Sequence, residues 1–148
     1  MKNLSTTAVV MMIGASVLFV ERTALAQEPG TGNTQRQFDS VELKQGQDLF
    51  RRNCAVCHGW NAEGTVRNWQ KRDADGKLPP PPLNGTAHAW HHSTQVLHRT
   101  IRDGTQSLGG SMPPWREKLS DEEILLIIQW LTSLWPEEIY EVWLKQNQ

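Results

Sequence analysis

Apolar positions recur at helical spacing in three segments of the chain, and no segment shows the apolar–polar alternation that is typical of a strand. The first predicted helix is capped at Asp39 or Ser40 and runs to about Asn53. The second begins at Ser93 or the following threonine and stops at Gly104, because glycine is preferred directly after a helix. The pattern therefore predicts an all-α fold.

The strongest helical signal starts at the capping box formed by residues 120–123. The core side of this third helix consists of Ile124, Ile127, Ile128, Leu131, Leu134 and Trp135. Pro136 ends the helix and can open another, since acidic residues follow in its first turn. We therefore expect three core helices, short helices and loops, and an extra C-terminal helix within residues 136–148.

Residues 61–82 are rich in charge, glycine and proline, and they are predicted to form a loop with at most one short helical turn. Asp73, Asp75 and Gly76 are spaced as at the start of a calcium loop, but the remaining oxygen ligands of such a loop are missing. A simple turn is expected there.

The start of the chain has the features of an export signal. Lys2 is basic, an apolar run covers residues 8–20, and Ala24-Leu25-Ala26 matches a signal peptidase site. Residues 1–26 are therefore predicted to be a signal peptide, which places the mature protein in the periplasm. The apolar run is short for a membrane span, and an uncleaved anchor is the alternative. Residues 27–38 are predicted to be a disordered leader to one domain over residues 39–148.

The charge balance does not favour a nucleic acid as a partner. The chain has 148 residues, with 15 Lys and Arg against 16 Asp and Glu, and a formal net charge of −1. Such a balance supplies no basic face for nucleic acid. No contact with a membrane is expected once the signal peptide has been removed.

The segment Cys54-Ala55-Val56-Cys57-His58 is the most specific pattern in the sequence. C-x-x-C-H is the attachment signature of c-type haem, in which both cysteines form thioethers and the histidine binds the iron. Cys54 and Cys57 are therefore predicted to hold one covalent haem c, with His58 as an axial ligand. The alternatives are a zinc site, a thioredoxin-like pair and a structural disulfide. Zinc would need a second ligand pair, and the chain has no third cysteine.

The second axial ligand of a haem iron decides between electron transfer and small-molecule chemistry. Met112 is the only methionine after the predicted signal peptide, and it follows two glycines and precedes two prolines in a loop. The glycines allow close approach of the backbone and the prolines stiffen the segment, so Met112 is the predicted ligand. The alternative is a methionine that fills an apolar gap. Histidines that compete for the iron are His88, His91, His92 and His98.

Taken in this order, the haem motif, the methionine loop and the capped last core helix resemble those of class I cytochromes c. The resemblance covers roughly residues 41–134. In that family the first and last core helices cross near a glycine and an aromatic pair. The resemblance assigns these places to Gly46, Phe50 and Trp130, and it accounts for a glycine inside a helix.

The family also has a Pro-x-Leu-x-Gly stretch, which residues 81–85 match. The resemblance implies that the Pro81 carbonyl accepts a hydrogen bond from the imidazole of His58, and that Leu83 packs on the haem. Such bonds orient a ligating histidine and tune its basicity. Residues 86–92 and 136–148 are not parts of the minimal family core.

The predicted function is electron transfer in the periplasm, without catalysis. One haem c with His58 and Met112 as axial ligands would exchange one electron in transient contacts with a donor and an acceptor protein. It is left open whether the carrier acts as a redox subunit of a larger complex. One alternative is a haem subunit or small enzyme with a labile sixth ligand that acts on peroxide or nitric oxide. Another is an accessory factor that handles copper through His88, His91 and His92.

Overall fold

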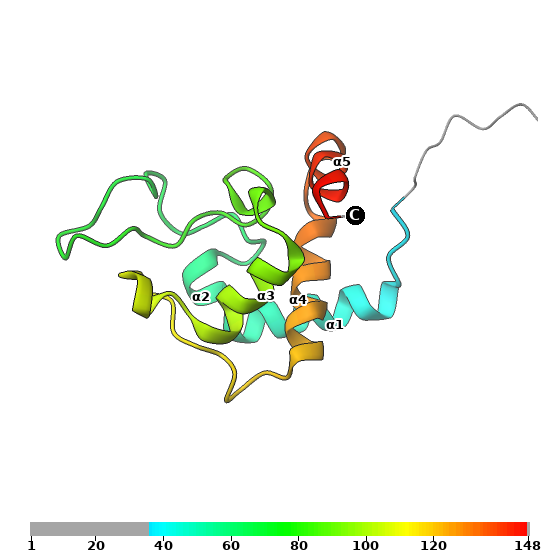
Figure 1. Ribbon diagram of the computed structural model, residues 1–148, viewed down its shortest axis with the longest axis horizontal. Helices are drawn as coiled ribbons and strands as arrows, with labels where there is room; N and C mark the ends of the chain where they lie inside the picture. Colours follow the sequence, from blue (N-terminus) through cyan, green and yellow to red (C-terminus); the bar gives the residue numbers. More distant parts are fainter. Residues whose placement is uncertain (1–35, 148) are drawn as a thin grey trace, which may run out of the picture. The chain divides into compact units, whose positions relative to one another are not determined.

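The computed structural model describes residues 36–147, and these residues contain helices and loops but no strand. The prediction of an all-α fold is confirmed. In chain order the elements are α1 (Ser40–Asn53), α2 (Ala55–His58), η1 (Ala89–His91), α3 (Thr94–Asp103), η2 (Gln106–Leu108), α4 (Asp121–Ser133) and α5 (Glu137–Gln146) (Figure 1).

The core helices begin and end close to the residues predicted from the sequence, and local hydrogen bonds fix these limits. The Asp39 side chain accepts hydrogen bonds from two backbone N–H groups in the first turn of α1. Ser93 caps α3 in the same manner, and Gly104 follows that helix with φ +71°. Ser120 and Glu123 form both bonds of the capping box at the start of α4. These bonds satisfy N–H groups that a helix leaves without a partner at its first turn.

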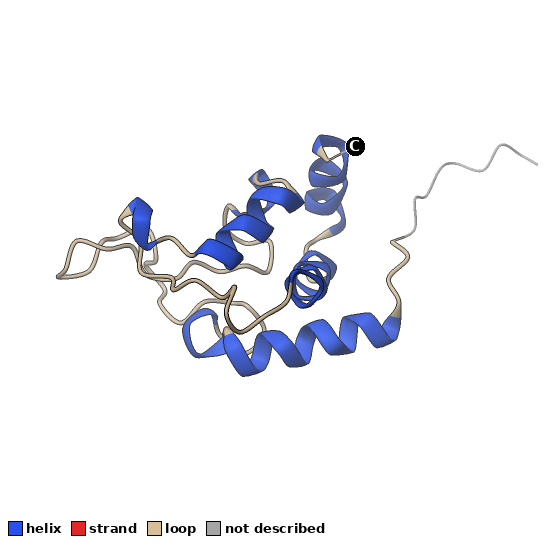
Figure 2. Cartoon of the chain, turned by 60° about the horizontal axis from the view of Figure 1, so that its bottom comes forward, coloured by secondary structure: helices blue, strands red, loops and turns tan. Residues whose placement is uncertain are grey.

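Helices α1 and α4 cross in the centre of the domain, where α4 is seen end-on over α1 (Figure 2). A Cβ at Gly46 would lie only 2.1 Å from the Leu126 carbonyl oxygen, so the two backbones approach more closely than a side chain would allow. Next to this contact the rings of Phe50 and Trp130 lie 4.7 Å apart between centroids. The crossing that the resemblance implied is present in the structure.

A second apolar cluster lies at the junction between α4 and α5. Helix α4 ends at Ser133, so Trp135 lies beyond it instead of on its core side. Trp135 packs edge-on against Trp143 of α5, with centroids 5.4 Å apart, and Ala89 of η1 completes the buried part of this cluster. The predicted C-terminal helix is therefore present, and it packs on η1 through its own apolar face.

Residues 36–38 also contact this second cluster. The Arg36 guanidinium donates a 2.7 Å hydrogen bond to the Trp135 carbonyl and lies 4.1 Å from the ring centre of Tyr140. Phe38 packs edge-on against the same tyrosine. These residues are held by the domain, unlike the disordered leader predicted up to residue 38. The rest of that leader and the predicted signal peptide lie outside the described residues.

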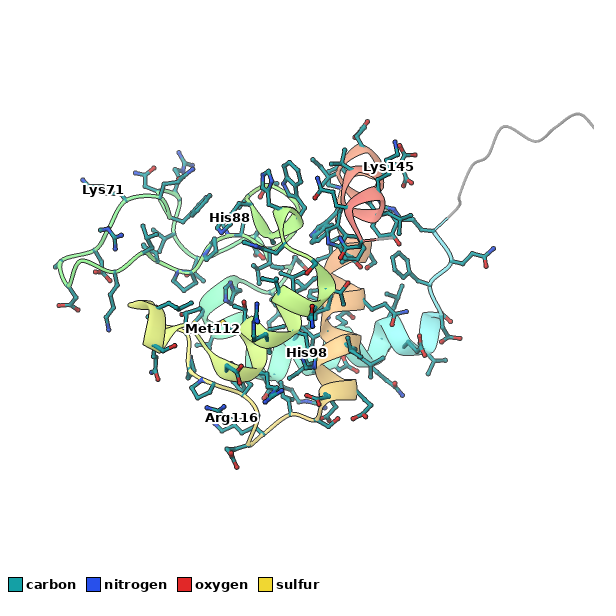
Figure 3. All side chains as sticks on the ribbon, viewed as in Figure 1. Lys71, His88, His98, Met112, Arg116 and Lys145 are labelled. Carbon is teal, nitrogen blue, oxygen red and sulfur yellow. The ribbon has the colours of Figure 1, made fainter. Side chains whose placement is uncertain are left out.

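The segment between α2 and η1 forms a long loop that extends away from the helices, with Lys71 in its outer part (Figures 1 and 3). The Asp73 side chain accepts hydrogen bonds from the N–H groups of Asp75 and Lys77, which makes the expected turn. Within residues 36–147, none of the helices has the length and apolar character needed to cross a bilayer.

Candidate haem site

The C-x-x-C-H motif begins at the last turn of α1 and fills the short helix α2. Cys54 caps α1, and its carbonyl accepts hydrogen bonds from the N–H groups of Cys57 and His58 at 3.1 and 3.0 Å. Cys54 is buried, Cys57 is exposed, and the two sulfurs are not joined in a disulfide. Burial, with a smaller contribution from Cys57, raises the pKa of the Cys54 thiol to about 12.

His58 is 8% exposed and has one defined partner. Its Nδ1 lies 3.0 Å from the Pro81 carbonyl oxygen. Because a carbonyl can only accept, Nδ1 carries the proton in this bond, and Nε2 is the nitrogen with a free lone pair. Burial lowers the pKa of His58, while the Pro81 carbonyl acts in the opposite direction. A neutral imidazole is the form that binds a metal.

The carbonyl of Pro81 belongs to a run of four prolines, residues 79–82. Proline has no N–H, so this run cannot anchor itself by donating backbone hydrogen bonds. The first donor after it is Leu83, whose N–H bonds to the Ala62 carbonyl at 2.7 Å. The Leu83 side chain is half-buried and packs against both apolar clusters.

Met112 lies in the loop between η2 and α4 (Figure 3). Its side chain is half-buried and packs against the main core. Thr105 holds its backbone on both sides: the Thr105 hydroxyl accepts from the Met112 N–H at 3.1 Å, and the Met112 carbonyl accepts from the Thr105 N–H at 3.0 Å. Trp115 ties the end of the loop to the carbonyls of Ile101 and Arg102.

Thr105 was not predicted from the sequence to take part in the site. A threonine directly after a helix-ending glycine is a weak signal, because its hydroxyl can also bond to water or to its own neighbours. The loop glycines give a better clue. A Cβ at Gly110 would lie 2.2 Å from the Thr105 hydroxyl oxygen, so this glycine allows the loop to close on Thr105.

The histidines after the motif are engaged with aromatic rings. His91 stacks on Trp90 with ring centres 3.7 Å apart, and His88 stacks on Trp69. His88 and His92 meet edge to face at 5.7 Å. In the part of the chain that the structure describes, no group of three or more His, Cys, Asp or Glu side chains is arranged to hold a metal ion.

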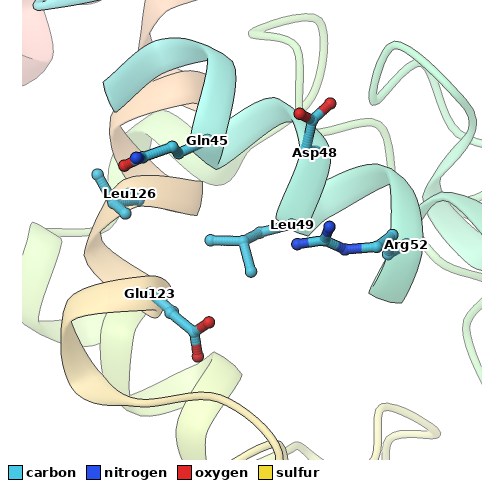
Figure 4. Close-up of a pocket in the computed structure, with 6 residues that line it drawn as sticks. All are labelled: Gln45, Asp48, Leu49, Arg52, Glu123 and Leu126. Atoms are coloured by element: carbon cyan, nitrogen blue, oxygen red, sulfur yellow. The ribbon is translucent and has the colours of Figure 1, made fainter. Parts of the chain in front are cut away.

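A surface pocket of about 340 Å³ lies beside the crossing between α1 and α4 (Figure 4). Its lining residues are Gln45, Asp48, Leu49, Arg52, Glu123 and Leu126. The lining contains none of the predicted haem residues.

The residues of the site fit a covalently bound haem. Two free thiols flank one turn of helix, and a buried imidazole directly after them has its Nδ1 occupied by a carbonyl. The side chains of Leu83 and Met112, both predicted to contact the haem, are half-buried and pack on the apolar core. The described part of the domain is thus helical and carries the haem attachment motif of a c-type cytochrome.

Comparisons with known proteins also indicate a c-type cytochrome. A family model described as "Cytochrome C oxidase, cbb3-type, subunit III" matches residues 41–131. Cytochrome c6 of Bryopsis maxima is 32% identical, over 56% of this chain and 81% of the relative. The cbb3-type cytochrome c oxidase subunit CcoP of Azospirillum brasilense is 28% identical, over 67% of this chain and only 30% of the subunit's length.

A solved structure is similar as well. The crystal structure of cytochrome CL from Methylophaga aminisulfidivorans MPT superposes with a TM-score of 0.51 and 26% identity, over 71% of this chain and 63% of that one. The chain belongs to the family of cbb3-type subunit III cytochrome c domains. Membership confirms the predicted cofactor, covalent haem c.

Proposed function

We propose that the protein is a periplasmic electron carrier in which Cys54 and Cys57 attach one haem c, and His58 and Met112 are its axial ligands. When bound, haem c supplies one-electron oxidation and reduction. The observation that carries the proposal is the buried His58 ring, which bonds through Nδ1 to the Pro81 carbonyl and keeps Nε2 for the iron.

The two proposed ligands differ in what they contribute. His58 is held neutral by burial and oriented by the Pro81 carbonyl, which also raises its basicity as a ligand. Met112 provides a thioether, and such a ligand raises the reduction potential of a c-type site. Because Thr105 fixes the backbone of Met112 on both sides, we expect little rearrangement at this ligand when the electron enters or leaves.

The redox partners are proposed to be proteins that bind transiently. Val56, which lies between the two cysteines, is 85% exposed, and the nearby Trp60 is 59% exposed. Exposed apolar side chains beside the haem attachment site favour a contact through which a haem edge can meet a partner. Small, short-lived interfaces are typical of such redox encounters.

The ligand set is tested by the visible and far-red spectra of the haem-loaded protein in both oxidation states. We expect a low-spin ferric protein with a charge-transfer band from methionine to iron, and loss of this band in Met112→Ala. Ser111→Ala, a change at the neighbouring exposed position, is the control and should keep the band. A high-spin iron, or a spectrum indifferent to Met112→Ala, would show that Met112 is not the ligand.

Export is tested separately by mass spectrometry of the protein recovered from the periplasm. We expect a mature chain that begins at Gln27 and carries the added mass of one haem. A chain that retains residues 1–26 in the membrane fraction would instead support the uncleaved anchor.

A further inference from the structure

The position of the Pro81 carbonyl depends on residues beyond the proline run. Residues 79–82 have no N–H to donate, and successive prolines form a stiff extended segment. The nearest peptide groups with defined backbone bonds are those of Leu83, two residues after Pro81. What fixes Leu83 therefore helps to fix the carbonyl that faces His58, together with the packing of the buried Pro82 near Gly64.

Leu83 is held from both sides. Its N–H bonds to the Ala62 carbonyl at 2.7 Å, and its carbonyl accepts a 2.8 Å bond from the indole N–H of Trp135. The first bond leads back to the haem-binding motif. The second leads to the junction between α4 and α5, which lies beyond the residues that match the family model.

Close packing at Gly85 supports the same connection. Gly85 has φ +91°, and a Cβ there would lie 2.9 Å from Cδ of Pro136 and 3.2 Å from Cα of Trp135. The backbone after the proline run is thus in direct contact with the α4–α5 junction. Trp135 itself is 3% exposed and is wedged against Trp143, so its indole has one defined orientation.

We propose that Trp135 is a positioning residue of the haem site. Its indole N–H holds the Leu83 carbonyl, and through the stiff proline run it keeps the Pro81 carbonyl in place as the acceptor for His58 Nδ1–H. The proposal rests on His58 being a haem ligand. It extends the site to a residue beyond those that match the family model, and it gives the C-terminal extension a role in setting the haem environment.

The test is Trp135→Phe in the full, haem-loaded protein, since phenylalanine keeps an aromatic ring and removes the N–H. In the ferric protein the Nδ1 proton of an iron-bound histidine gives a paramagnetically shifted NMR signal, whose exchange with solvent can be timed. We expect this exchange to be about two- to tenfold faster in the variant, the range that loss of one hydrogen bond allows. The reduction potential should rise, because a weaker bond to Nδ1–H makes His58 a less basic ligand.

Trp143→Phe is the matched control. Trp143 belongs to the same cluster and donates an indole hydrogen bond of the same 2.8 Å length, but to the His92 carbonyl. The Trp143→Phe substitution should leave the exchange of the His58 Nδ1 proton and the reduction potential unchanged. Equal effects of both variants would mean general loosening of the cluster and would overturn the proposal, as would an unchanged Trp135→Phe protein.

If Trp135→Phe fails to take up haem, benzothienylalanine at position 135 replaces it, because this residue has the shape of tryptophan without the N–H. The same faster exchange is then expected. A wild-type protein without a shifted His58 signal would overturn the ligand assignment together with this proposal. A wild-type signal whose exchange does not respond at position 135 would overturn the role of Trp135 alone.

Discussion

The α-carbon of Gly46 faces the backbone of Leu126 so closely that a methyl group on it would lie 2.1 Å from the Leu126 carbonyl oxygen. That oxygen belongs to the backbone of α4 and cannot rotate away as the end of a side chain could. Helices α1 and α4 can lie this close only because glycine has no side chain at position 46. The position of the motif that follows α1 depends on this distance.

Gly46→Ala should therefore destabilise the domain, although alanine favours a helix more than glycine does. We expect a loss of about 1–3 kcal/mol or more in the free energy of unfolding, the range for overpacked cores. Denaturant unfolding of the haem-loaded protein measures it. Gly76→Asn is the control, because a side chain at Gly76 meets nothing within 4 Å and asparagine tolerates its φ of +77°. Higher stability in Gly46→Ala would contradict the packing described.

Phe50→Ala should remove the side chain that fills the centre of the same crossing. Phe50 is 0% exposed and packs on Trp130, and truncation of such a ring costs about 3–5 kcal/mol. Thermal or denaturant unfolding provides the measurement. Val41→Ala on the outer face of α1 is the comparison: Val41 is 62% exposed, and its loss should change stability by less than about 0.5 kcal/mol. Similar losses for the two variants would be inconsistent with this core.

Asn147→Ala should loosen the start of α3, a helix 53 positions earlier in the chain. The Asn147 side-chain oxygen accepts a 2.9 Å bond from the N–H of Thr94, one of the amides that a helix start leaves free. We expect faster hydrogen exchange at Thr94 and a loss of about 1 kcal/mol in stability. Asn147→Asp retains an acceptor at this point and should preserve slow exchange at Thr94. Fast exchange in both variants would exclude the capping role.

His88 should titrate below its ordinary pKa of 6.5, because burial and then repulsion from His92 and His91 lower its pKa. The unfolded chain then binds the proton more readily than the folded one. Protonation of His88 therefore lowers the free energy of unfolding as the pH falls below 6.5 through the folded pKa. An NMR titration measures the midpoint. His92→Ala should raise it, whereas His98→Ala should leave it unchanged. A midpoint at or above 6.5 would contradict the arrangement of the three rings.

The helix limits were predictable because short-range bonds set them. Asp39 bonds to amides two and three residues away, and Ser120 and Glu123 bond to each other, so the sequence around each position contains the whole signal. The haem motif is local in the same sense. The family resemblance added the crossing at Gly46 and the contact between His58 and Pro81, which residue patterns alone do not reveal.

Bonds between distant segments that the resemblance does not cover were not predictable. Trp135 was expected on the core side of α4 from its helical spacing, but the helix ends before it and the indole bonds to a carbonyl 52 positions away. Arg36 was expected in a disordered leader because its neighbours are polar, yet it bonds 99 positions away. Such pairs depend on the three-dimensional path of the chain, and nothing in the local sequence marks them.

The bond between the Leu83 N–H and the Ala62 carbonyl closes the base of the long loop. The outer part of this loop, around Lys71, extends away from the helices (Figure 3), while residues near its two ends, such as Gly64 and Pro81, bond to His58. The entropy of closing such a loop rises only slowly with its length, by about 0.6 kcal/mol for each doubling. Insertions or deletions near Lys71 should therefore leave the contact between His58 and Pro81 intact. This segment is the part of the protein where a new sequence, such as a label or a binding peptide, can be introduced beside a haem without rebuilding it.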